Sequence, residues 1–229
     1  MFRFIVLALT TQVCRAFVTT TSHVLQEPGW SSSTAVHGAT LVSPDVSNII
    51  EEACIDAASR MQRLPVPVST DIHPDGQVGV SYVHWPAVGR KTSQVPIFLV
   101  HGFDSSCLEY RRLGPLLAAQ GIDTYAVDLL GWGFSQLAGV QTFGAAAKVE
   151  TLMSFIDEVS GGKPFCISGA SLGGAAAIEV AAINEKCQGL VLLDAQGFVD
   201  GIGPMASLPT PLAKLGVGVL SKFVAKVIL

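Results

Sequence analysis

The stretch Gly169-Ala170-Ser171-Leu172-Gly173-Gly174 decides the fold of this 229-residue chain. It joins a short apolar run at residues 165–167 to a run of small and apolar residues, 175–180, that is typical of a helix. A serine on a tight strand-to-helix turn needs glycine two residues before and two residues after it, because a side chain there would collide with the neighbouring backbone. Its hydroxyl then stands exposed beside a helix N-terminus. The simpler alternative is a glycine-rich turn in which Ser171 only caps the helix. The strand before it and the helix after it favour instead a turn that exposes the Ser171 hydroxyl as a nucleophile.

A second loop, His101-Gly102-Phe103, comes directly after the apolar strand expected at residues 96–100. Gly102 lets the backbone turn at the strand end, so the N–H groups of Phe103 and Leu172 can point at the same spot. Two such donors form an oxyanion hole for a tetrahedral intermediate. His101 precedes the turn, and for it hydrogen bonding to nearby loop backbone is favoured over proton transfer.

A third loop, Asp128-Leu129-Leu130-Gly131-Trp132-Gly133-Phe134-Ser135, follows the strand expected at residues 122–127. Asp128 and the glycines indicate a loop held by side-chain-to-backbone hydrogen bonds. Trp132 is a candidate pocket wall. The favoured role of this loop is architectural.

Around these loops, short apolar runs alternate with helical periods. A hairpin is expected around residues 73–76, joining strands at 66–69 and 78–84. Further strands are expected at 96–100, 122–127, 164–167 and 190–193, and helices at 109–120, 143–159 and 172–183. Strands that are apolar on both faces and separated by helices indicate a parallel sheet covered on two sides. The expected fold class is therefore α/β, with a doubly wound, mostly parallel sheet.

As a set, the three loops resemble the α/β-hydrolase superfamily, and the resemblance covers about residues 64–204. It implies an eight-stranded sheet in which 78–84 is the second strand and 190–193 the sixth. It also implies that Ser171 is the nucleophile and that Phe103 and Leu172 donate to the oxyanion. A serine rather than an aspartate at the turn points away from epoxide hydrolases and dehalogenases, and towards hydrolysis of a carboxylic ester, thioester or amide. No metal or organic cofactor is implied.

The superfamily places an acid and then a histidine after the serine, but every histidine here precedes Ser171: His23, His37, His73, His84 and His101. Asp194 is a candidate acid, although a structural role at the strand end is favoured for it. The resemblance therefore implies a hydrolase fold lacking its last two strands, in a truncated chain that is inactive as given, with the histidine encoded downstream. The alternative is a non-catalytic protein of this fold that binds a small hydrophobic ligand or a protein partner.

Four segments are expected along the chain. Residues 1–43 form a presequence with the layout of a signal peptide, which resembles the bipartite presequences of algal plastids; plastid import and the secretory pathway both stay open. Residues 44–63 form an amphipathic helix, and residues 64–194 form the hydrolase core. Residues 195–229 begin a lid or a helical tail, and within them 212–229 could instead lie on a membrane surface.

The amino-acid composition excludes several classes of protein and of binding partner. An apolar share of 49% with a net charge of −4 excludes a disordered chain. A pI near 5.7 gives no basic surface for nucleic acid. Five cysteines without a C-x-x-C spacing indicate neither a disulfide framework nor a zinc site. The expected partner is a small ester-type substrate.

Overall fold

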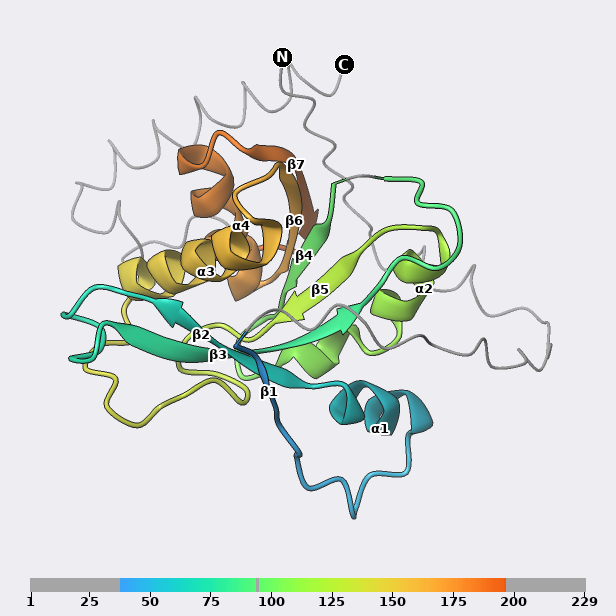
Figure 1. Cartoon of the computed structure of the whole chain (residues 1–229), viewed down its shortest axis with the longest axis horizontal. Helices are drawn as coiled ribbons and strands as arrows, with labels where there is room; N and C mark the ends of the chain where they lie inside the picture. Colours follow the sequence, from blue (N-terminus) through green and yellow to red (C-terminus); the bar gives the residue numbers. More distant parts are fainter. Residues whose placement is uncertain (1–37, 94, 197–229) are drawn as a thin grey trace.

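The computed structural model describes residues 38–93 and 95–196 as a seven-stranded mixed sheet with helices on both faces (Figure 1). In spatial order the strands are β1 (Thr40–Leu41), β2 (Gln62–Pro67), β3 (Gln77–Trp85), β5 (Thr124–Val127), β4 (Ile97–Val100), β6 (Phe165–Ala170) and β7 (Cys187–Leu193). Neighbours from β5 to β7 pair in parallel, whereas β3 pairs antiparallel with both β2 and β5. Five strands therefore share one direction, which confirms the predicted doubly wound, mostly parallel sheet.

The helices are divided between the two faces of the sheet. Two buried clusters pack against the sheet, one on each face. The first contains residues of α3 (Ala145–Ser160) and α4 (Leu172–Ile183). The second contains residues of α1 (Glu52–Ser59), the 3₁₀ turn η2 (Cys107–Tyr110) and α2 (Leu113–Ala119) (Figure 1). Successive side chains of β4 point to opposite faces of the sheet: Phe98 and Val100 pack in the first cluster and Leu99 packs in the second. Both faces of the central strands are thus buried, as their continuous apolar runs indicated.

The predicted helix at 44–63 is wrong in its extent. The structure has a helix only over Glu52–Ser59. The Asp45 carboxylate accepts a hydrogen bond from the Ser47 N–H at 2.9 Å, a local bond that competes with helix formation. Glu51 is extended, and its two carboxylate oxygens bind Arg111 and Arg112, each at 2.8 Å. Helix α1 therefore begins only after Glu51, whose side chain bonds two arginines at the start of α2.

The predicted helix at 109–120 is also corrected, because it is split into η2 and α2. Two tertiary hydrogen bonds hold η2 in its tighter turn: the Cys107 N–H donates to Asp128 Oδ1 at 2.5 Å, and the Tyr110 hydroxyl donates to the Val100 carbonyl at 2.7 Å. A further difference concerns the expected presequence 1–43, because residues 40–41 belong to the sheet as β1 and pair with residues 62–63.

Several expectations fall on residues outside the described ranges. These are the rest of the presequence, His23 and His37 within it, and residues 197–229 with the expected lid or membrane-surface helix. Over the part of the chain that is described, no helix has both the length and the apolar character needed to cross a membrane.

The aromatic contacts around Phe98 generate a prediction about stability. Phe98 is fully buried, and its ring lies 5.3 Å from Tyr125, 6.1 Å from Phe155 and 5.9 Å from Phe165, measured between centroids. We expect Phe98→Ala to lower the free energy of unfolding by about 3–5 kcal/mol, because it leaves a cavity at the centre of the sheet. Urea titration followed by circular dichroism measures this. Leu116→Ala, at an exposed site on α2, is the control, and an equal loss for both would contradict the prediction.

Candidate active site

Ser171 occupies a strained turn between β6 and α4. Its backbone angles are φ 47° and ψ −117°, a conformation that residues with a side chain adopt rarely and at a cost of about 1–3 kcal/mol. The residue is exposed, and its side chain makes no capping hydrogen bond to the helix. The alternative in which Ser171 is only a helix cap is therefore excluded.

The glycines on either side of Ser171 are required by close backbone contacts. A Cβ atom on Gly169 would lie 2.2 Å from the Gly173 carbonyl oxygen. One on Gly173 would lie 2.3 Å from the Val100 carbonyl oxygen and 2.4 Å from that of His101. Real Cβ atoms never approach so closely, so no other residue fits at either position without a backbone shift. The first turn of α4 is thereby packed directly on the end of β4.

The backbone of Ser171 is also fixed by the segment after β7. The Ser171 N–H donates to the Leu193 carbonyl at 3.2 Å, and the Gln196 N–H donates to the Ser171 carbonyl at 2.8 Å. Asp194 lies between these two partners, with a positive φ of 47°. It is exposed, and within the described ranges its carboxylate takes part in no hydrogen bond or ion pair. The structure thus brings Asp194 to the same edge of the sheet as Ser171 without bonding the two side chains.

The loop after β4 lies against Ser171. A Cβ atom on Gly102 would be 3.4 Å from the Ser171 Cβ. The Gly102 carbonyl accepts a hydrogen bond from His101 Nδ1 at 2.7 Å, and the Gly102 N–H donates to Glu109 Oε2 at 3.0 Å. In a trans peptide the C=O and the following N–H point in opposite directions. His101 therefore fixes the direction of the Phe103 N–H, pointing it away from the imidazole ring.

His101 itself is completely buried and bonds loop backbone through both ring nitrogens. Its Nε2 accepts from the Leu129 N–H at 3.1 Å, while its Nδ1 donates to Gly102. Together these bonds require the neutral ring with its proton on Nδ1. Among the described residues, neither the Phe103 nor the Leu172 amide has a hydrogen-bond acceptor.

Asp128 ties the third loop to η2. Its buried carboxylate accepts from the Cys107 N–H and, at 2.7 Å, from the Phe134 N–H. Burial raises the pKa of the Asp128 carboxyl, and burial together with that charge raises the pKa of the Cys107 thiol. From the same loop, Trp132 packs edge-on against Phe103, with ring centroids 4.7 Å apart. The three loops are thus joined at one edge of the sheet.

The other described histidines are engaged away from Ser171. His84 stacks on Tyr125 at a centroid distance of 4.1 Å and pairs with it in the register of β3 and β5. That pair lies next to the first residue of β5, at the sheet edge opposite to Ser171. His73 hydrogen-bonds the Asp75 N–H at 3.2 Å and lies 3.3 Å from the Ala138 carbonyl. Neither histidine forms a hydrogen bond with Ser171.

The sequence did not predict the role of one residue beside this site. Glu109 was placed only at the start of a helix, yet its carboxylate binds the Gly102 amide next to Ser171. No pattern in the sequence signals this bond, because it depends on how η2 folds back. A search for three or more His, Cys, Asp or Glu side chains that could hold a metal ion finds none among the described residues.

Comparisons with known proteins show the family of this chain. The family model described as serine aminopeptidase, S33, matches residues 91–229. The alpha/beta hydrolase domain-containing protein VTE7 of Arabidopsis thaliana is 35% identical over 185 residues, which are 80% of this chain and 55% of that protein. The chain thus spans about half the length of this curated relative.

Solved structures share the fold at low sequence identity. A probable hydrolytic enzyme from Pseudomonas aeruginosa PAO1 is 22% identical, with a TM-score of 0.52 over 61% of this chain and 43% of that chain. A membrane phospholipase A is 20% identical, with a TM-score of 0.50 over 69% of this chain and 46% of that chain. At such identities the similarity concerns the arrangement of strands and helices.

The contact between Gly173 and the end of β4 can be tested by adding a methyl group. We expect Gly173→Ala to destabilise the protein by about 1–3 kcal/mol, since the carbonyls of Val100 and His101 must move to admit it. Thermal and urea unfolding measure the loss. Gly144→Ala, at the start of α3 where only a side-chain atom at 3.6 Å comes near, is the matched control. Equal stability of the two variants would argue against the contact.

The two bonds of His101 give a second prediction. In His101→Ala the buried Gly102 carbonyl and Leu129 N–H lose their hydrogen-bond partner. We therefore expect the free energy of unfolding to fall by about 2–4 kcal/mol. Hydrogen exchange followed by mass spectrometry should show faster exchange of the Leu129 amide, with α3 as the internal reference. Unchanged protection at Leu129 would refute the assigned bond.

Proposed function

We propose that this chain, which belongs to the α/β-hydrolase superfamily as its sequence predicted, is a serine hydrolase with Ser171 as its nucleophile. The observation that carries the proposal is the conformation of Ser171. Its backbone is held in a strained turn, while its exposed hydroxyl makes no capping bond. A turn that served only the fold would not need a side chain in this conformation.

In the proposed reaction, Ser171 Oγ attacks the carbonyl carbon of a carboxylic ester, thioester or amide. The hydroxyl proton passes to a base, and the carbonyl oxygen gains the negative charge. The N–H groups of Phe103 and Leu172 donate to this oxyanion. Collapse of the intermediate expels the protonated leaving group and leaves an acyl group on Ser171, which water then removes.

The base for this reaction is not one of the described histidines. His101 is locked between two loops, and His73 and His84 are engaged elsewhere. Asp194 remains a candidate acid, supported by its place between the two residues that bind the Ser171 backbone. A serine without a base is a weak nucleophile.

That observation favours a second candidate function. A protein of this fold could keep the turn and the free amides and bind a small hydrophobic ligand or a protein partner without catalysis. Phe103, which is 69% exposed, and Trp132 provide apolar surface beside Ser171 for such binding. The two functions differ in the reactivity of Ser171.

A fluorophosphonate probe measures that reactivity. For a serine hydrolase we expect covalent labelling of the 229-residue chain that is lost in Ser171→Ala, because phosphorylation needs an activated hydroxyl. Ser154→Ala, at a half-buried position on α3, is the control and should label as the unmodified chain does. Peptide mass spectrometry locates the adduct. If intact, folded protein is not labelled but a longer transcript is, the hydrolase proposal holds for the longer chain; absence of labelling in both favours the non-catalytic function.

A further inference from the structure

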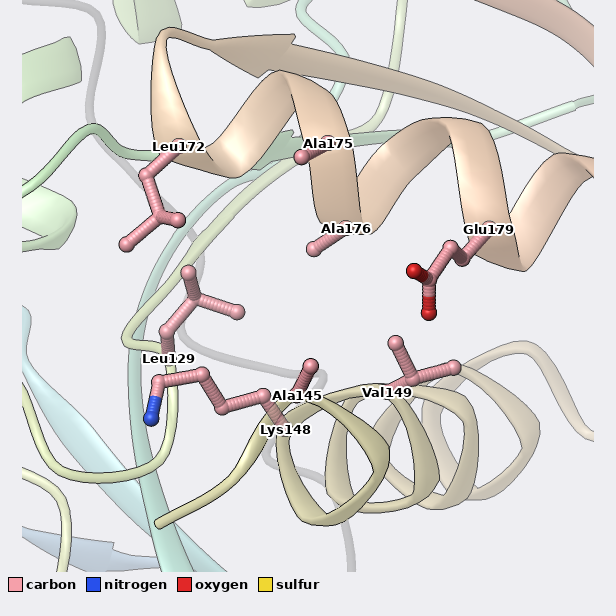
Figure 2. A pocket seen from close by; sticks show the side chains of 8 residues that line it. All are labelled: Leu129, Ala145, Lys148, Val149, Leu172, Ala175, Ala176 and Glu179. Carbon is pink, nitrogen blue, oxygen red and sulfur yellow. The ribbon is translucent and has the colours of Figure 1, made fainter. Parts of the chain in front are cut away.

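An apolar pocket of about 60 Å³ lies between α3 and α4 (Figure 2). Its walls come from both helices and from the loop after β5: Leu129, Ala145, Lys148, Val149, Leu172, Ala175, Ala176 and Glu179. Three of these are alanines, and their small size leaves the space open. Almost all of the lining surface is apolar, so the pocket suits a hydrocarbon group better than a polar one.

The pocket is lined by Leu172, the residue that follows Ser171 in the sequence. Leu172 forms its wall at the N-terminal end of α4, opposite Leu129 (Figure 2). The backbone N–H of Leu172 is a proposed oxyanion donor, so the carbonyl of a bound ester would lie at this end.

Charged groups bound the pocket without filling it. The Lys148 amine donates to the Phe143 carbonyl, which leaves its aliphatic stem facing the pocket. Burial lowers the pKa of this amine. Glu179 lines the other end, and its carboxylate points towards the space (Figure 2). A negative charge there disfavours an acyl chain that ends in a second carboxylate.

We propose that this pocket binds a short, unbranched, uncharged aliphatic arm of the ester, an inference that rests on the proposed function. A cavity of about 150 Å³ accommodates benzene. A volume of about 60 Å³ therefore suits roughly two or three carbon atoms better than an aromatic ring. The arm is either the acyl chain or the alcohol chain of the substrate, since both are attached to the same carbonyl carbon.

Binding to a chain that cannot react tests the pocket separately from catalysis. In the 229-residue chain carrying Ser171→Ala, methyl butyrate and butyl acetate are titrated, and dissociation constants are measured by ligand-detected NMR. Adding Ala145→Leu should weaken binding about tenfold or more, because the new side chain fills the pocket from α3. Ala145 is exposed, so the fold should tolerate the change. Ala146→Leu, exposed on the same helix but outside the pocket, is the matched control.

The outcomes are distinct. Weakening of methyl butyrate alone assigns the pocket to the acyl chain, and weakening of butyl acetate alone assigns it to the alcohol chain. Ala175→Val, from the opposite wall, should repeat the result if Ala145→Leu disturbs folding. Absence of binding by both esters, or equal binding by the Ala145 and Ala146 variants, overturns the proposal. Ester binding that Ala145→Leu abolishes, together with absence of fluorophosphonate labelling in both the unmodified chain and a longer transcript, would retain the pocket and reject the hydrolase.

Discussion

The site depends on one close contact, the packing of the first turn of α4 on the carboxyl end of β4. Without side chains at Gly169 and Gly173, the helix N-terminus reaches the carbonyls of Val100 and His101. This approach sets Ser171 beside Gly102 and brings two separate loops to one spot. Because the contact is between backbones, it leaves almost no freedom to adjust. The position of the Ser171 backbone is therefore fixed by this packing together with its two hydrogen bonds to the segment after β7.

A network of buried polar bonds holds the loops around that contact. His101 and Asp128 each bind backbone in two separate segments, and Glu109 holds the Gly102 amide. Each bond contributes about 0.5–3 kcal/mol, the larger values applying to the carboxylate acceptors, and a buried group left without its partner is costly. Such a network resists partial rearrangement, because moving one loop would leave groups unpaired in the others. Donors fixed in advance in this way stabilise a developing charge without reorganisation.

The sequence predicted the parts that depend on local pattern. The glycine spacing around Ser171 is imposed by sterics, and helix α4 has the bounds expected for it, residues 172–183. The hairpin formed by β2 and β3 and the order of strands and helices also followed from periodicity. What could not be predicted depends on tertiary bonds. The break between η2 and α2 follows from the partners of Cys107 and Tyr110, and the late start of α1 follows from the bonds of Glu51. The role of Glu109 and the pocket beside Leu172 arise only when distant segments meet.

The strain at Ser171 bears on why a serine occupies this turn. Glycine would adopt φ 47° at less cost, and a helix cap would recover a hydrogen bond that Ser171 does not make. The residue thus gives up stability twice, in its backbone and in its unused hydroxyl. Its neighbours do not explain this, because the glycines at 169 and 173 already satisfy the packing. The proposed nucleophilic role of Ser171 depends on this strained turn and exposed side chain, beside two amides that have no acceptor within the described residues.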